Sequence, residues 1–302
     1  MSRRILIPAL WCAASLGIAF SFGVPTSHDL VFVWVASGLA AFSVTDLRRR
    51  IPGFVTDWLP FMAILFVYDK LRGIADGLLF PTHTYPQIHI ESLLFGKPIP
   101  TVWLQHHLWH GGAHLHWWDY AVWFVYLTHF FATLVVAGVL WLKFHDRFAR
   151  FASMVCVLAL AGFTTYVLYP AVPPWLAAQD GHIGEANRIV AVVWPKVPLA
   201  HYGSLFEKGQ TYANNVAAMP SLHGAYALLI ALYLWRMVPR WWRPLLALYP
   251  VAMGFALVYT GEHYAVDVIA GWIYATVTFV AVNRFFAWRD ARVPVYEPAY
   301  VD

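Results

Sequence analysis

The sequence predicts an all-α integral membrane protein with about eight transmembrane helices, on three observations. Of its 302 residues, 60% are hydrophobic, and the mean hydropathy is +0.57. Only 12% are charged, about half of the roughly 25% that a soluble domain carries. Apolar runs of the length that crosses a bilayer recur along the chain. The length suits one helical bundle rather than several domains.

Eight apolar runs are candidate spans, and each is expected to be a helix because an open strand leaves its backbone unsatisfied in lipid. The second, third and sixth runs are short or interrupted. The first run follows Arg3 and Arg4, as in a signal peptide, but it lacks a clear small-residue cleavage site, so we expect a retained span. The runs cover approximately residues 5–22, 29–45, 54–71, 119–142, 150–169, 221–237, 243–260 and 264–285.

The basic residues predict the orientation of this bundle. With eight spans, 14 of the 20 Lys and Arg residues fall on one side, which the positive-inside rule makes cytoplasmic, with both termini. This asymmetry also accounts for the net charge of +4, so nucleic acid is not an expected partner. The protein is predicted to be a multi-pass plasma (cell) membrane protein. Cys12 and Cys156 lie within apolar runs and imply no disulfide framework.

Two long outer segments, about residues 72–118 and 170–220, are rich in Pro, Trp and His. We expect them to form ordered caps at the membrane surface rather than linkers. The stretch YPAVPPWLA over 169–177 cannot continue the preceding helix, because Pro170, Pro173 and Pro174 interrupt it. It is predicted to turn the chain at the outer interface.

Polar residues from three predicted spans converge at the outer ends of those spans. Ser221 and His223 open the sixth span, His263 and Asp267 open the eighth, and Asp69, Lys70 and Arg72 close the third. His263 and Asp267 are four residues apart and share a helix face, so the carboxylate can hold one imidazole nitrogen and leave the other basic. Ser221 is expected at or near a helix N-cap, where its hydroxyl and the backbone N–H groups form an anion site. Lys70 and Arg72 offer cations to phosphate oxygens.

Simpler interpretations exist for each group taken alone. A histidine at the membrane edge can be an interfacial anchor, the His–Asp pair can cap or pack a helix, and Lys70 or Arg72 can reach toward lipid headgroups. If all of these simpler interpretations held, three unrelated polar groups would have to lie on the same side of the membrane by coincidence. Ionisable groups in membrane spans are costly and mark candidate functional sites.

The stretches MPSLH (219–223) and HYAVD (263–267) resemble the second and third signature motifs of the phosphatidic acid phosphatase type 2 superfamily. YPAVPPW (169–175) and YDKLRG (68–73) look more like its inositol phosphorylceramide synthase branch and related actinobacterial proteins. The resemblance implies a six-helix catalytic core over 54–285, preceded by two transmembrane helices in 1–53 and followed by a cytoplasmic tail, 286–302.

This resemblance also implies the roles of the residues. His263 would form a phosphohistidine, Asp267 would orient it, and His223 would protonate the leaving oxygen. Ser221, Lys70 and Arg72 would bind the phosphate. No metal or other cofactor is implied, because the cations and N–H groups would stabilise the pentavalent charge.

The chain departs from the common motifs at three points. Leu222 replaces the usual glycine of the second motif, and Leu257 stands where the third motif has an arginine. Lys70 and Arg72 are also closer together than the lysine and arginine of the first motif. A phosphate-binding cation must therefore come from elsewhere, with Arg188 and Lys208 as candidates. This favours a phosphotransferase over a simple phosphatase.

Five histidines fall within eleven residues in the stretch LQHHLWHGGAHLHWWD, and they admit a metal-binding interpretation. His106 and His110 could share a helix face. A plain interfacial loop, or one lining a headgroup pocket, is the alternative. His129 lies deeper in its span, either as a buried hydrogen-bonded residue or reaching the site from beneath. The five are His106, His107, His110, His114 and His116.

The sequence therefore predicts a lipid phosphotransferase or phosphatase that acts at the extracytoplasmic face, with a membrane lipid as substrate. Transfer of an inositol-phosphate-type headgroup is one form of this activity. The alternatives are a lipid translocase or transporter, which should carry polar groups near the midplane, and a receptor-like or structural membrane protein, which needs no His–Asp pair. The donor lipid, the acceptor and the oligomeric state are not determined by the sequence.

Overall fold

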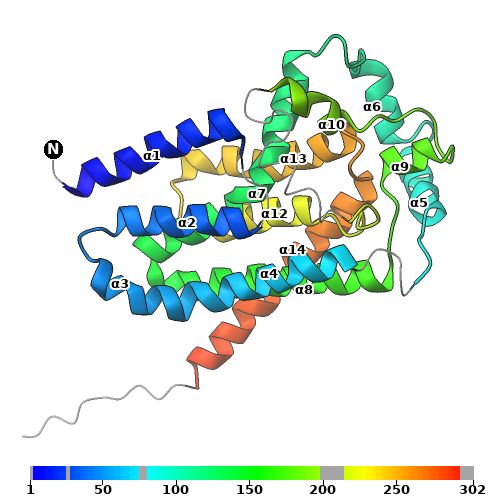
Figure 1. Cartoon of the computed structure of the whole chain (residues 1–302). Coiled ribbons are helices and arrows are strands. Elements are labelled where there is room, and N and C mark those ends of the chain that lie inside the picture. Colours follow the sequence, from blue (N-terminus) through cyan, green and yellow to red (C-terminus); the bar gives the residue numbers. More distant parts are fainter. Residues whose placement is uncertain (1–2, 25–27, 75–79, 198–213, 293–302) are drawn as a thin grey trace, which may run out of the picture.

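The eight predicted spans are helical in the structure, a computed structural model that describes residues 3–24, 28–74, 80–197 and 214–292 (Figure 1). The third predicted span, 54–71, combines a π-helical turn with a longer helix, and a short helix precedes it. The helices are α1 (Arg3–Phe22), α2 (His28–Phe42), α3 (Leu47–Gly53) with the π-turn Phe54–Trp58 and α4 (Leu59–Ile74), α7 (Trp117–Lys143), α8 (His145–Leu168), α12 (Leu222–Leu234), α13 (Arg243–Tyr259) and α14 (Ala265–Asp290).

The all-α membrane class is confirmed. Six helical stretches among the described residues are long and apolar enough to cross a bilayer. Two further apolar helices, Leu30–Phe42 and Leu222–Leu234, are shorter, as the sequence indicated for the second and sixth runs. The number of spans, the domain boundaries and the orientation stay predictions.

A π-turn opens the third predicted span. Pro52 and Gly53 precede it, and the Thr56 hydroxyl donates to the Pro52 carbonyl oxygen at 3.1 Å. Asp57 within the turn accepts hydrogen bonds from Trp141 Nε1 at 2.9 Å and from His145 Nε2 at 2.8 Å. The turn is thereby held against the junction of α7 and α8.

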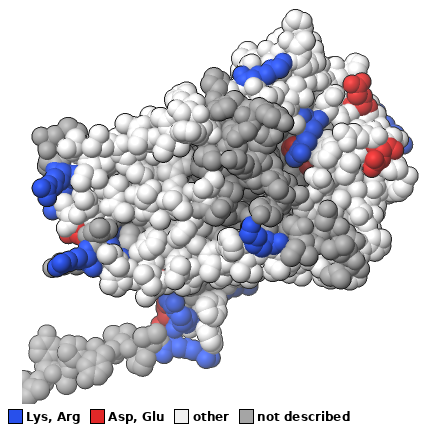
Figure 2. All heavy atoms as spheres, viewed as in Figure 1, with Lys and Arg blue, Asp and Glu red and all other residues white. Residues whose placement is uncertain are grey.

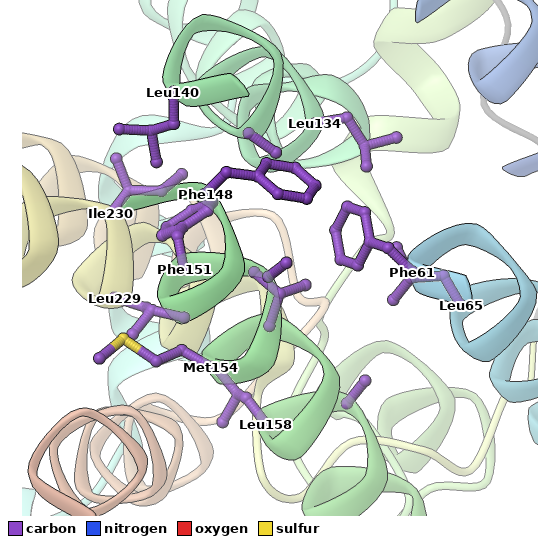
Figure 3. Close-up of a cluster of buried hydrophobic side chains, with 14 of the residues drawn as sticks. Phe61, Leu65, Leu134, Leu140, Phe148, Phe151, Met154, Leu158, Leu229 and Ile230 are labelled. Atoms are coloured by element: carbon purple, nitrogen blue, oxygen red, sulfur yellow. The ribbon is translucent and has the colours of Figure 1, made fainter. Parts of the chain in front are cut away.

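Helix α12 occupies the centre of the bundle, where it packs against α14, α13, α7 and α8. Figure 3 shows the largest apolar cluster, to which α4, α7, α8 and α12 all contribute side chains. Many large apolar side chains on α1, α7, α13 and α14 instead point outward and are exposed, as expected of helices whose outer faces meet lipid. The labelled cluster residues are Phe61, Leu65, Leu134, Leu140, Phe148, Phe151, Met154, Leu158, Leu229 and Ile230.

The described parts of the two segments predicted to lie outside form a cap of short helices at one end of the bundle (Figure 1). They are α5 (Tyr85–Phe95), α6 (Pro100–Leu108), α9 (Pro174–Gln179) and α10 (Ile189–Val193), the last followed by a 3₁₀ turn, Trp194–Lys196. The described parts are therefore helical, as expected of ordered caps, and their position at the membrane surface stays a prediction. Figure 2 shows basic side chains at the end where α3 lies, and both basic and acidic side chains over the cap.

Candidate active site

Helices α12 and α14 begin side by side beneath the cap, and their first turns are hydrogen-bonded together. Ser221 is the N-cap of α12, as predicted, and its hydroxyl oxygen accepts from the Gly224 N–H at 3.3 Å. Its own backbone N–H donates to the Asp267 carbonyl oxygen at 2.9 Å. A Cβ added at Gly271 would lie closer than 3.0 Å to the Ser221 carbonyl oxygen. The absence of a side chain at Gly271 therefore permits this close approach.

The two motif histidines come together at this junction. His263 Nε2 lies 3.3 Å from His223 Nδ1, and His263 Nδ1 lies 2.8 Å from the Ala218 carbonyl oxygen. Since a carbonyl can only accept, Nδ1 of His263 carries a proton. In a neutral imidazole the lone pair then resides on Nε2, and His223 donates to it. The arrangement places a basic nitrogen and an acidic proton at one point.

Asp267 is fully buried and close to His263, but it does not hold the imidazole by a direct hydrogen bond. Its Oδ2 is 3.8 Å from His263 Nδ1 and accepts from the Tyr264 N–H at 2.9 Å. The sequence predicted that the carboxylate would hold the imidazole; in the structure the Ala218 carbonyl accepts that bond. Asp267 is placed to act on the imidazole through its charge.

The Pro-rich segment 169–175 fixes the position of Ala218. The Ala218 N–H donates to the Ala171 carbonyl oxygen at 3.2 Å, and the Ala171 N–H donates to Val216 at 2.7 Å. His83 bonds the other edge of this segment, through Pro170 and Val172. The segment ends α8 as predicted, and it also anchors the carbonyl that orients His263.

A third histidine contacts the pair from α7. The His129 and His223 ring centroids are 3.9 Å apart, and the Tyr126 ring stacks on His223 at 5.2 Å. Of the two possibilities that the sequence left open, the structure shows His129 reaching the site. Tyr126 and His129 together form the surface against which the His223 ring rests.

The structure describes the expected phosphate-binding cations to different extents. Lys70 Nζ lies 5.3 Å from the Phe66 ring centroid. Only the backbone is described for Asp69 and Arg72, at the end of α4, and Lys208 lies outside the described residues. Arg188 binds Glu262, the residue before His263, through Nε at 2.7 Å and Nη2 at 3.2 Å.

The two leucine departures both lie in packed positions. Leu222 is 4% exposed, and a Cβ added at Gly162 on α8 would be 2.8 Å from its side chain. Gly162 thus leaves the space that Leu222 fills. Leu257 is fully buried, in a cluster with Met253 and Tyr259, so this position offers no cation to a phosphate.

The histidine cluster is divided between two elements. His106 and His107 belong to α6, whereas His110 lies beyond the end of that helix. The ring of His110 packs against that of His116, with their centroids 4.7 Å apart. His106 and His110 therefore do not share a helix face. Within the described residues, no group of three or more His, Cys, Asp or Glu side chains is arranged to hold a metal.

Sequence reasoning missed two carboxylates near His263. Glu262 pairs with Arg188, and Glu91 on α5 accepts hydrogen bonds from the first turn of α14. A lone acidic residue in the mostly apolar stretch IHIESLLF was the available signal for Glu91. The carbonyl of Ala218 has no sequence signal, because every residue carries one.

Fold and site together define a multi-pass α-helical membrane protein with paired histidines at one end of its bundle. The chain belongs to the PAP2 superfamily, whose sequence profile matches residues 100–281, and the predicted resemblance is thereby confirmed. It is also 28% identical over 141 residues to a phosphoinositol dihydroceramide synthase of Bacteroides thetaiotaomicron. This alignment covers 43% of the chain and 43% of that relative. No solved structure is significantly similar to the chain.

Proposed function

We propose that this protein is a lipid phosphotransferase or phosphatase that works through a phosphohistidine on His263. The observation that carries the proposal is the arrangement of His263, whose Nδ1–H donates to Ala218 while its Nε2 faces Nδ1 of His223. Membership of the PAP2 superfamily supports an enzyme that acts on lipid phosphate. No such support exists for a translocase.

In the first step, Nε2 of His263 attacks phosphorus as the bond to the leaving oxygen breaks. His223, protonated on both ring nitrogens, gives its Nδ1 proton to that oxygen and is left as a neutral imidazole. In the second step a hydroxyl attacks the phosphohistidine, His223 takes the hydroxyl proton, and His263 is released. The buried Asp267 carboxylate stabilises the positive charge that develops on the His263 ring.

Phosphate binding is assigned to the first turn of α12, around Ser221, together with Lys70 and Arg72. A helix N-terminus favours an anion through its N–H groups and its dipole. Arg188, one of the two cations that the sequence offered, is retained as a candidate, because its pairing with Glu262 brings a guanidinium to the residue next to His263. It would supply the cation that Leu257 does not.

We place the site at the extracytoplasmic face of the plasma membrane, because 14 of the 20 Lys and Arg residues fall on the other side of an eight-span map. The name of the bacterial relative supports a phosphoinositol headgroup as the transferred group and a lipid alcohol as the acceptor. Water as acceptor would make the same site a phosphatase.

The test is to trap the phosphohistidine. Purified protein is mixed with a panel of lipids carrying labelled phosphate, with and without alcohol acceptors, and quenched at alkaline pH, where phosphohistidine survives. Label on His263 is expected, and His263→Ala should abolish both label and turnover. His223→Ala should lose about 10²–10⁴-fold in rate, the usual contribution of a general acid. His89→Ala, at an exposed position on α5, is the matched control.

Full activity of His263→Ala would refute the covalent mechanism. Inactivation by a chelator with rescue by zinc would do the same, and it would direct attention to the histidines of residues 106–116. Transfer of label to an alcohol rather than to water would distinguish a phosphotransferase from a phosphatase.

A further inference from the structure

Glu91 joins the cap to α14, the helix that begins two residues after His263. Glu91 lies on α5 and is fully buried. Its two carboxylate oxygens accept hydrogen bonds from consecutive N–H groups of α14, those of Ala265 at 3.0 Å and Val266 at 3.1 Å. Asp267 takes the preceding N–H, that of Tyr264. The first N–H groups of a helix have no acceptor within that helix. At the start of α14, the carboxyl groups of Glu91 and Asp267 are the acceptors for these N–H groups.

This arrangement is a costly way to cap a helix. Glu91 lies beside a small apolar cluster that includes Ile88, Ile99 and Val266. Burial raises its pKa to about 7 even though two backbone N–H groups lower it, and the nearby charge of Asp267 raises it further. Tyr264, the N-cap residue of α14, is the other titratable group there that interacts electrostatically with Glu91. A buried charge is weak evidence for stability, so the fixed geometry of its two oxygens is the stronger explanation.

Two helix N-termini meet at the site, and each is a potential anion site. The carboxyl groups of Glu91 and Asp267 already accept from the N–H groups at the N-terminus of α14, so these donors are not available to a phosphate. The first turn of α12, at Ser221, is the terminus that remains for it. Glu91 precedes residues 100–281, the part of the chain that matches the family.

We propose that Glu91 is a positioning residue for His263, which fixes the first turn of α14 two residues away and reserves phosphate binding for α12. This inference rests on the proposed function for its catalytic consequence. Its structural part, the fixing of residues 263–266, holds independently of any reaction. The two parts can therefore be tested by separate measurements.

The test compares Glu91→Ala and Glu91→Gln with Glu185→Ala in the full-length protein in lipid nanodiscs. Glu185 is an exposed carboxylate of the cap whose contact is a 3.4 Å bond to Asn187. Hydrogen exchange over 261–268 and the rate of His263 carbethoxylation by diethyl pyrocarbonate report on the helix terminus without any substrate. Steady-state kinetics on the lipid that labels His263 report on catalysis.

For Glu91→Ala we expect exchange at residues 265 and 266 to rise about tenfold or more, since the two N–H groups lose their acceptors. The carbethoxylation rate of His263 should change with it. We expect kcat to fall about 10–100-fold with KM within about threefold, because small misplacements of a nucleophile act on the chemical step. Glu91→Gln keeps one acceptor and should give intermediate values, whereas Glu185→Ala should match the wild type.

Wild-type exchange and labelling in both Glu91 variants would overturn the inference. So would a parallel loss of kcat in Glu185→Ala, or a drop in activity that follows only the folded fraction. If Glu91→Ala does not fold, Glu91→Gln decides by the same criteria. If the wild type transfers no phosphate, the proposed function fails, and the exchange and labelling results alone decide whether Glu91 fixes α14.

Discussion

The close approach of α12 and α14 depends on Gly271, and Gly271→Ala tests it. The added Cβ would come within 3.0 Å of the Ser221 carbonyl oxygen, whereas ordinary contacts begin at 3.4 Å. The first turn of α12 must therefore retreat by at least 0.4 Å, the difference between these limits. The same shift along the line between the histidines would stretch the 3.3 Å contact of His263 and His223 to about 3.7 Å, beyond hydrogen-bond range.

The expected energetic effect is substantial. Overpacking costs about 1–3 kcal/mol, and weakening the Ser221 N–H bond to Asp267 adds about 1 kcal/mol. A total of about 2–4 kcal/mol corresponds to a fall of about 4–16 °C in Tm for a chain of this size. Since misplacement by about 1 Å can reduce a rate about 10²-fold, we expect kcat to fall about 10-fold or more.

The assay is thermal unfolding in detergent, followed by tryptophan fluorescence, together with turnover of labelled lipid. Gly17→Ala is the control, because a Cβ on that α1 residue meets nothing within 4 Å. A Gly271→Ala protein as stable and as active as Gly17→Ala would show that α12 does not depend on this contact. The reasoning about the Ser221 junction would then be wrong.

Three further predictions concern other contacts of the site. Gly162→Ala should lower stability by about 1–3 kcal/mol through overpacking against Leu222, and adding Leu222→Ala should restore part of it in a double-mutant cycle. Because burial raises the pKa of Glu91 from 4.5 to about 7, its contribution to stability is greatest below pH 4.5 and is lost as pH rises through 7. This pH-dependent contribution to the free energy of unfolding is about 3 kcal/mol, and Glu91→Gln should remove the corresponding pH dependence of Tm. Arg188→Lys should raise the KM for lipid phosphate about tenfold, since lysine cannot keep the bidentate bond to Glu262. An unchanged KM in steady-state kinetics would exclude Arg188 from the phosphate site.

The sequence was sufficient for the all-α membrane class and for locating the motif residues. Lipid imposes one rule on every span, a continuous apolar run with a helical backbone, so the pattern predicts the elements without reference to their packing. The pairing of His223 with His263 followed from motif order and from the equal depth of the two span ends. The N-cap of Ser221 is likewise local, because it depends on residues within one turn.

The tertiary structure decided what surrounds those residues. The acceptor for His263 is the carbonyl of Ala218, 45 residues away, and Glu91 caps α14 across 174 residues. Neither contact has a local pattern, since one uses a group that every residue carries and the other depends on how the cap packs on the bundle. His129 reaches His223 because α7 packs on α12. Sequence fixes residue type and helix phase, whereas the packing of distant helices selects which backbone oxygen, carboxylate or ring meets the imidazole.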